Sequence, residues 1–331
     1  MNILLIGGTG TFINNLIIKL NKEGHRLYLL TGDRYKQSPY QKVFERYDFT
    51  YDSPCLNEIF ESVNPDLTLY MGAFDTNYRW HEEEKESVRF LTNLTNILMC
   101  YAMNSTGRFL YLSSHEVYSG DYENNIWEDE PCTPSGCRGM VLTQAEQLCE
   151  SYRTFQGRDV VSLRIDHLYG IPNSRKEINN ICAKMCLEVL EDNQITITEG
   201  NSFSMMYETD AVEFIFRLIN QKEHQYGVYN ISSGIEISEY DVAEMVREAM
   251  KEDVEIVSGK DYGARRVLDG QLYESEFGNP YCCDMFAIIQ KMAEHMKKNR
   301  YIFLTGEAEK LPFWKRVAEK SSWFVKALIP F

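Results

Sequence analysis

The fold is decided near the amino terminus by the stretch Ile3-Leu4-Leu5-Ile6-Gly7-Gly8-Thr9-Gly10-Thr11-Phe12-Ile13. Its first four residues form an apolar run typical of a buried strand, and residues 12–20 carry apolar side chains at helical spacing. Between them, Gly7 permits a tight turn and Gly10 lets the backbone approach a bound group closely. Because the amino end of a helix is positive and its first amides are unpaired, this turn suits a phosphate.

Further strand and helix patterns alternate after this stretch. The strand patterns cover residues 26–30, 67–71, 109–112 and 160–163, and the helical patterns cover 12–20, 56–63, 88–103 and 143–152. Strands that alternate with helices form a parallel sheet covered by helices on both faces. The sequence therefore predicts an α/β protein built on a doubly wound Rossmann sheet.

The regular alternation ends after Pro172. We expect a helix at 177–190, a strand at 195–197, a helix at 211–219 and a strand at 228–231. This pattern favours a smaller mixed α/β carboxy-terminal lobe. We assign residues 1–172 to the Rossmann domain, with 204–232 returning to pack on it, 173–203 and 233–308 to the lobe, and 309–331 to a tail.

Charge and cysteine content exclude some classes of function. The 331-residue chain has a formal net charge of -15 and no dense cluster of Lys or Arg, so nucleic acid is not an expected partner. The chain opens without a basic leader, and its nine cysteines form no Cys-x-x-Cys pair, which favours reduced thiols and a cytoplasmic location. Cys182 and Cys186 lie one helical turn apart and are expected on a core face, so no metal site is predicted.

Four further segments agree in order and spacing with one known family. They are Pro65-Asp66-Leu67-Thr68-Leu69-Tyr70-Met71-Gly72-Ala73, Ser87-Val88-Arg89-Phe90-Leu91-Thr92-Asn93-Leu94, Phe109-Leu110-Tyr111-Leu112-Ser113-Ser114-His115-Glu116-Val117-Tyr118, and Leu163-Arg164-Ile165-Asp166-His167-Leu168-Tyr169-Gly170-Ile171-Pro172. With the glycine turn, these segments resemble the nucleotide-sugar epimerase/dehydratase branch of the extended short-chain dehydrogenases/reductases. The resemblance implies a small-molecule nucleotide or nucleotide-sugar ligand and a homodimer.

The resemblance also implies a bound dinucleotide, either NAD or NADP. Its expected contacts are Gly7, Gly8, Thr9, Gly10, Thr11, Phe12, Ile13, Gly72, Ala73, Phe74, Ser87, Ser113 and His167. After the second strand, Asp33 suits a ribose hydroxyl and Arg34 suits a 2′-phosphate, and both equally suit a solvated turn, so the choice of cofactor stays open. Ile13 stands where the family has its third glycine, and its bulk would either push the helix away from the sheet or demand compensation nearby.

The usual catalytic pair of this family has no counterpart in the sequence. Alignment of Pro134 to Glu146 with the family's Tyr-Gly-x-x-Lys helix places Arg138 on the tyrosine and Leu142 on the lysine, and no Tyr-x-x-x-Lys occurs anywhere in the chain. An arginine stays protonated and cannot serve as a general base, and a leucine cannot bind a ribose. The resemblance therefore implies an altered or absent reaction.

The remaining catalytic candidates are Ser114, His115, Glu116 and Arg138. Ser114 matches the family's hydroxyl that binds the reacting group, and His115 and Glu116 resemble a half-altered copy of the acid and base of the dehydratases. Arg138 suits an anionic ligand group. The alternative is that Ser114 only caps the strand end and that His115 and Glu116 face solvent. Three functions stay open. The first is an NAD(P)-dependent enzyme with a reassigned acid or base, and the second is an inactive pseudoenzyme that serves as a nucleotide-binding regulator or scaffold. The third is a scaffold that has lost nucleotide binding, in which only the fold and the basic tail matter.

Two differences lie further along the chain. Phe203 stands where the family has an arginine that grips the nucleotide. In the tail, residues 310–331 carry five Lys or Arg against Glu319 alone, with aromatic residues between them. This segment suits an anionic membrane surface or a protein partner, and a helix packed on the domain is the alternative.

Overall fold

The structure is a computed structural model that describes residues 1–30, 42–44, 54–75, 78–80 and 82–306. Its centre is a seven-stranded sheet in the order β10-β6-β5-β4-β1-β2-β3, and every neighbouring pair is parallel. The strands are β1 (Asn2–Ile6), β2 (Arg26–Leu30), β3 (Lys42–Phe44), β4 (Leu67–Tyr70), β5 (Arg108–Ser114), β6 (Val160–Ile165) and β10 (Val228–Ile231). This order confirms the predicted doubly wound Rossmann fold.

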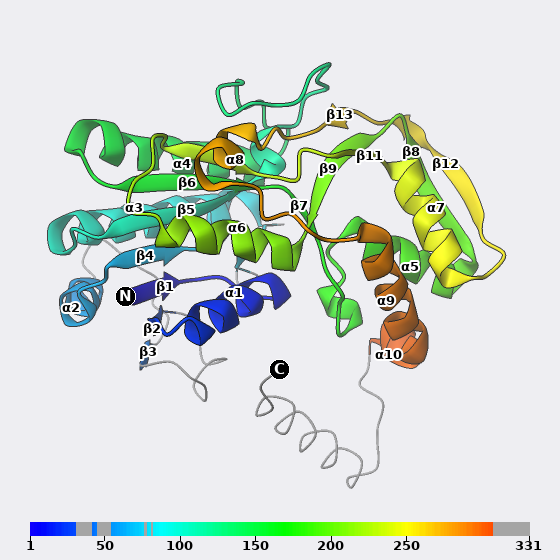
Figure 1. Cartoon of the computed structure of the whole chain (residues 1–331), viewed down its shortest axis with the longest axis horizontal. Helices are drawn as coiled ribbons and strands as arrows, with labels where there is room; N and C mark the ends of the chain where they lie inside the picture. Colours follow the sequence, from blue (N-terminus) through cyan, green and yellow to red (C-terminus); the bar gives the residue numbers. More distant parts are fainter. Residues whose placement is uncertain (31–41, 45–53, 76–77, 81, 307–331) are drawn as a thin grey trace, which may run out of the picture.

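Helices cover both faces of the sheet (Figure 1). On one face lie α1 (Thr11–Lys22), α6 (Glu208–Asn220) and α8 (Gln271–Phe277), and on the other lie α2 (Pro54–Val63), α3 (Glu83–Asn104) and α4 (Cys137–Gln156). Successive strand residues point to opposite faces, so Ile3 and Leu5 pack toward α1 while Leu4 and Ile6 pack toward α2 and α3. The strands read as continuous apolar runs because both of their faces are buried.

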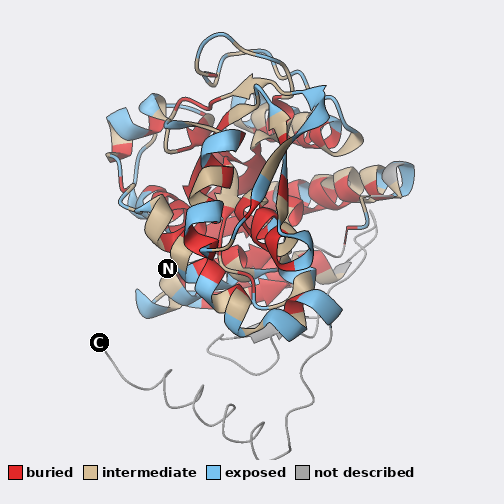
Figure 2. Cartoon of the chain, turned by 90° about the vertical axis from the view of Figure 1, so that its right-hand side faces the viewer, coloured by how far each residue is buried: buried red, intermediate tan, exposed pale blue. Residues whose placement is uncertain are grey.

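The lobe has a separate core, formed around two small sheets. One joins β11 (Glu236–Ser238), β9 (Ser202–Tyr207) and β13 (Arg265–Arg266), with β7 (His167–Tyr169) also paired to β9, and the other joins β12 (Glu255–Tyr262) to β8 (Gln194–Glu199). Its helices are α5 (Ile181–Asp192), α7 (Glu239–Met250), α9 (Met285–Lys298) and α10 (Arg300–Thr305). Figure 2 shows the buried residues on the inner faces of these helices. The mixed α/β lobe is confirmed, whereas the assigned domain boundaries stay predictions.

The helix expected at 177–190 differs from the structure at its start. Residues Arg175–Glu177 form a short 3-10 helix, and α5 begins only at Ile181. The reason is a cap, since the side-chain oxygen of Asn180 accepts a hydrogen bond from the amide of Ala183 at 2.9 Å. Cys182 and Cys186 both face the lobe core with no exposed surface, as their spacing predicted.

A buried ion pair joins α4 to the central sheet. Glu146 on α4 accepts hydrogen bonds from Arg164 on β6 at 2.8 and 2.9 Å, and it accepts a third from Ser113 on β5 at 2.5 Å. Burial alone would lower the pKa of Arg164, but the Glu146 carboxylate raises it above the ordinary value. This pair holds the middle of α4 at a fixed position over β5 and β6.

We expect Glu146→Gln to lower the free energy of unfolding by about 3–5 kcal/mol, because it leaves the buried charge of Arg164 without a counterion. The matched control is Glu150→Gln, one turn later on α4, where the pair with Arg153 is partly exposed. The control is expected to cost less than about 1 kcal/mol. Urea unfolding of both variants measures the difference, and equal losses would contradict a structural role for the buried pair.

Candidate functional site

The glycine turn forms an open cradle at the start of α1. Gly7, Gly8 and Gly10 have φ of 72°, 82° and 94°, a region that side chains other than glycine rarely adopt. A Cβ at Gly10 would meet no atom within 4 Å, and no side chain caps the helix there. Within the described residues, no acceptor meets the amides of residues 11–13. Open space beside unpaired amides fits the diphosphate of a dinucleotide.

Ile13 is accommodated by the turn itself. Its side chain is fully buried, and a Cβ placed on Gly8 would lie 3.2 Å from Cγ2 of Ile13 and 2.9 Å from Cβ of Met71. Gly8 therefore leaves the room that Ile13 fills, which is the compensation that the sequence demanded. At the start of α1, Oγ1 of Thr11 donates a hydrogen bond to the Glu208 carboxylate at 2.8 Å, and this bond links α1 to α6.

Residues Gly72–Phe74 form a short 3-10 helix, η2, against the glycine turn. The amide of Thr9 donates to the carbonyl of Phe74 at 2.9 Å, and the rings of Phe12 and Phe74 meet edge to face at 5.3 Å. The sequence-predicted contacts at residues 7–13 and 72–74 therefore lie together, at the adjacent ends of β1 and β4.

Next along the sheet edge, His115–Val117 form η3 directly after β5. Ser114 is buried, and its Oγ accepts a hydrogen bond from the amide of Glu116 at 3.4 Å. His115 is half-buried, and its ring stacks on that of His167 with centroids 3.5 Å apart. Burial lowers the pKa of His115 well below the ordinary value, and the nearby charges of His167, Arg138 and Arg266 lower it further. His115 is therefore a neutral imidazole held inside the site.

Arg138 connects η3 to η2. On the first turn of α4, its guanidinium pairs with the Glu116 carboxylate, donates to the carbonyl of Ala73 at 2.7 Å, and lies over the Trp80 ring at 5.7 Å. Gly139 makes this possible, because a Cβ there would overlap the carbonyl oxygen of Glu116. The arginine is therefore bound from two sides.

Leu142 lies one turn further along α4 and is fully buried in the core against α3 and the sheet. A leucine at this depth packs with its apolar neighbours and has no polar group to offer a ligand. Arg138, at the family's tyrosine position, therefore has polar surroundings, whereas Leu142, at the lysine position, has apolar ones.

Two further residues of the predicted cofactor contacts have hydrogen-bond partners within the protein, and their role toward a cofactor stays a prediction. Ser113 is fully buried and donates to Glu146 beneath α4, and the Ser87 hydroxyl lies 3.0 Å from the sulfur of Cys137 between α3 and α4. Asp33 and Arg34 fall outside the described residues.

Arg266 on β13 belongs to the site and was missed by the sequence analysis. It donates to Asn201 at 3.0 Å, and its buried Nε has no hydrogen-bond partner among the described residues. The positive charge of Arg266 contributes to the lowered pKa of His115. Nearby, the Phe203 ring lies 5.1 Å from the ring of His167. No sequence signal points to Arg266, because β13 is a two-residue strand that reaches the site only through its pairing with β9.

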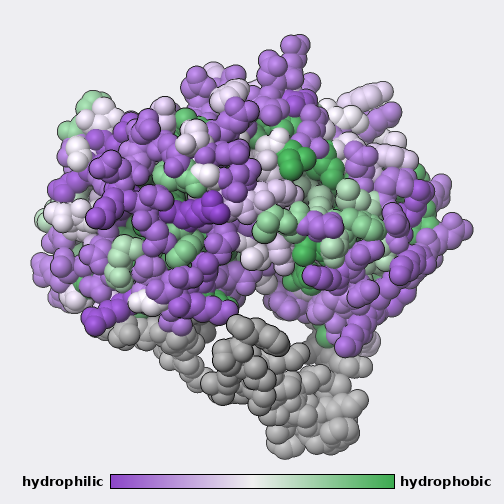
Figure 3. Space-filling view, in the orientation of Figure 1, coloured by the Kyte–Doolittle hydropathy of each residue, from purple (hydrophilic) through white to green (hydrophobic). Residues whose placement is uncertain are grey.

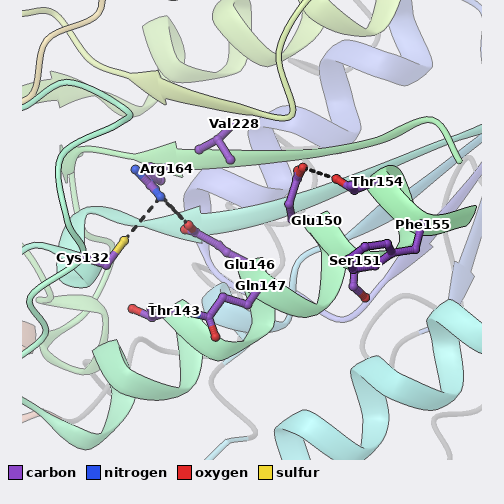
Figure 4. A pocket seen from close by; sticks show the side chains of 10 residues that line it. All are labelled: Cys132, Thr143, Glu146, Gln147, Glu150, Ser151, Thr154, Phe155, Arg164 and Val228. Carbon is purple, nitrogen blue, oxygen red and sulfur yellow. Dashed lines mark hydrogen bonds and ion pairs between the residues drawn. The ribbon is translucent and has the colours of Figure 1, made fainter. Parts of the chain in front are cut away.

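A separate cavity of about 600 Å³ opens beside α4, β6 and β10 (Figure 4). Its polar side chains already contact each other, since Arg164 binds Glu146 and Cys132, and Thr154 donates to Glu150 at 2.6 Å. None of the residues that line it belongs to the glycine turn, η2 or η3. In the described ranges, no group of three or more His, Cys, Asp or Glu side chains is placed to hold a metal ion. No helix of the described part is long and apolar enough to cross a membrane.

Comparison with known proteins agrees with this geometry. Residues 3–232 match the family model of the NAD dependent epimerase/dehydratase family. The chain belongs to this family. Among curated relatives, the dTDP-D-glucose 4,6-dehydratase of Dictyostelium discoideum is 27% identical over 276 residues, which cover 74% of this chain and 61% of that protein. UDP-glucuronic acid decarboxylase 6 of Arabidopsis thaliana is 25% identical, covering 77% of this chain and 76% of that protein.

Solved structures show the same epimerase/dehydratase fold. The UDP-glucose 4-epimerase of Thermotoga maritima with UDP-glucose has a TM-score of 0.76 at 17% identity, covering 91% of this chain and all of that one. The dTDP-glucose 4,6-dehydratase of Bacillus anthracis in complex with NAD has a TM-score of 0.71 at 17% identity, covering 92% and 98%.

We expect His115 to stay neutral at pH values where an ordinary histidine is protonated. Nitrogen NMR shifts of its ring, assigned with His115→Gln, should remain those of neutral imidazole from about pH 7.5 to 5.5. Because the unfolded chain binds the proton that folded His115 resists, this residue lowers stability as the pH falls below about 6.5. As the pH falls over that range, His115→Gln should therefore lose less stability than the parent protein. An NMR titration midpoint of His115 at or above the ordinary histidine pKa would contradict this prediction.

Proposed function

We propose that the protein binds NAD or NADP together with a nucleotide-linked sugar and oxidises a sugar hydroxyl, with His115 as the proton acceptor. The observation that carries this proposal is the contact of Arg138 with both Glu116 and the carbonyl of Ala73. Through these two hydrogen bonds, Arg138 joins η3, which contains the neutral His115, to η2. In turn, η2 packs on the phosphate-binding turn. The proposal rests on that geometry and on membership of the family.

The glycine turn and η2 hold the dinucleotide in this proposal. Amides of the first turn of α1 bind the diphosphate, and Gly72–Phe74 line the nicotinamide end. When bound, the nicotinamide accepts a hydride from the sugar carbon. The described residues do not separate NAD from NADP, so the proposal covers both.

The residues of η3 and α4 handle the proton. Neutral His115 accepts the hydroxyl proton while the carbon–hydrogen bond releases its electron pair as hydride, and the C–O bond becomes a carbonyl. The Glu116 carboxylate is already occupied by its ion pair with Arg138. Arg138 keeps its charge and stabilises negative charge on the reacting oxygen. Ser114 accepts from the Glu116 amide, and since no described residue accepts its own hydrogen, that hydrogen can be donated to the substrate oxygen.

Arg266 and two ring surfaces support the choice of substrate class. The buried, unpartnered Nε of Arg266 suits a phosphate oxygen, because a guanidinium binds phosphate through paired N–H groups. Phe203 lies beside Arg266 in the register of β9 with β13, and its ring lies 5.1 Å from that of His167. Relatives and structural neighbours carry names that include dTDP-D-glucose, UDP-glucuronic acid and UDP-glucose, which agrees with this class.

We expect Gly10→Ala to weaken cofactor binding by about tenfold or more, because its methyl group enters the open space of the cradle. The control is Gly24→Ala at the other end of α1, which has a similar φ of 80° and equally open surroundings. Both variants place an alanine at positive φ, which costs ~1–3 kcal/mol in backbone strain, so the control shows what strain alone does to binding. Calorimetry with NAD and NADP measures both, and parallel losses of affinity would place the cofactor elsewhere.

We expect turnover of at least one nucleotide sugar from a panel of UDP- and dTDP-linked hexoses, detected by product chromatography. His115→Gln should lower kcat by about a hundredfold or more, because no neutral base remains beside Ser114, while the Kd for the dinucleotide stays within about twofold. His25→Gln, a histidine of the α1–β2 connection, is the control and should leave both unchanged. An active His115→Gln enzyme would remove His115 from the reaction.

A second candidate is a pseudoenzyme that binds nucleotide for regulation or scaffolding. It is favoured by Leu142, which is fully buried and apolar, and by Arg138, whose guanidinium is already held by Glu116 and Ala73. Its signature is calorimetric binding of the dinucleotide with no product from any nucleotide sugar. The homodimer and the cytoplasmic location expected from the sequence stay predictions, since no contact between chains is described.

A further inference from the structure

A second groove, of about 530 Å³, lies in the lobe away from the glycine turn. Its apolar lining comes from β9, β11, α7 and the segment that leads into α9. These residues are Met205, Ile235, Ile237, Met245, Tyr281 and Met285. Ile235 is 56% exposed, so the groove presents apolar surface to solvent. Figure 3 shows apolar surface gathered where β9, β11 and α7 meet, with hydrophilic surface around it.

The polar lining of this groove is acidic. Glu236, Asp241, Glu244 and Glu248 line it, whereas no Lys or Arg does. Arg265 pairs with Glu236, and Arg247 pairs with Glu244 from the outer side of α7. Glu248 makes no ion pair with a described residue, and Asp241 only caps α7 through Ser238. The groove therefore combines an apolar floor with a negative rim.

The carboxy-terminal segment of the same chain has the complementary chemistry. Residues 310–331 carry a net charge of +4, from five Lys or Arg and Glu319, while the rest of the chain carries -15 - 4 = -19. Trp314, Val317, Phe324 and Leu328 recur at spacings of three, seven and four residues, which predicts one apolar face of a helix. Such a segment pairs an apolar stripe with basic flanks.

We propose that residues 310–331 dock in this groove of their own lobe, with the apolar face on the floor and the basic residues at the acidic rim. The length of chain permits it. The groove reaches Met285 at the start of α9, whose 14 residues span about 21 Å, and α10 follows. Between Gly306 and Trp314, where the apolar face begins, residues 307–313 can span up to about 23 Å, which is enough to return that face to the groove.

The charge of the chain favours this site over a lipid surface. A body with a net charge of -19 is repelled by an anionic membrane, while the same charges attract the segment to the lobe. Charge pairs at the rim fix the register, and burial of the aromatic residues supplies the driving force.

The test is hydrogen exchange of the full chain, followed by mass spectrometry over residues 233–248. We compare the parent chain with a tail variant, Lys315→Glu with Arg316→Glu and Lys320→Glu, and with a groove variant, Glu244→Lys with Glu248→Lys. Each set alone should speed exchange in this region by about tenfold, because the docked segment leaves. The two sets combined should restore protection, since the charges are then swapped. The control, Glu58→Lys with Glu61→Lys on the exposed side of α2, should change nothing.

Three results would overturn the proposal. Equal exchange in all variants would mean that the groove is uncovered. Protection that grows with protein concentration over about a tenfold range would assign the groove to a second copy. Exchange that slows at residues 310–331 only with phosphatidylglycerol vesicles would assign the segment to a membrane. Calorimetry with the dinucleotide should give one Kd for all these variants, so this test is independent of the proposed reaction.

Discussion

The parallel alignment of β1, β4 and β5 is the constraint on which the site depends. These strands are neighbours in the sheet, and parallel strands end at a common edge. The strand register places Ile6 beside Tyr70, and Tyr70 beside Tyr111. The carboxyl ends of β1, β4 and β5 therefore lie close together. The glycine turn, η2 and η3 therefore lie at one edge of the sheet, although more than 100 residues separate the glycine turn from η3 in sequence.

Helix α4 adds the charged component of the site, and its position follows from two contacts of opposite kind. The buried pair of Glu146 with Arg164 fixes the helix over β5 and β6. At its first turn, Gly139 allows close approach to the backbone of η3, so Arg138 reaches both Glu116 and Ala73. A guanidinium held in this way cannot exchange a proton itself, because it stays charged, and it occupies the carboxylate of Glu116 in an ion pair.

Local patterns were sufficient to predict the Rossmann sheet. The apolar run at residues 3–6 and the glycines after it need no distant partner to be recognised, and a parallel sheet covered on both faces follows from the alternation of strands and helices. The start of α5 was misplaced because a single capping side chain, Asn180, outweighs the helical spacing that precedes it.

The site was predictable only where its residues follow long strands. Residues 72–74 and 114–116 come directly after β4 and β5, so strand prediction locates them. Arg266 lies on a two-residue strand whose position depends on pairing with β9, and no local pattern carries that information. The alternative that His115 faces solvent was likewise undecidable from sequence, since the stack on His167 depends on β7 lying against the end of β5. Burial lowers the pKa of His115, and the charge of His167 in that stack lowers it further, so a contact that no local pattern predicts contributes to the acid–base character of the site.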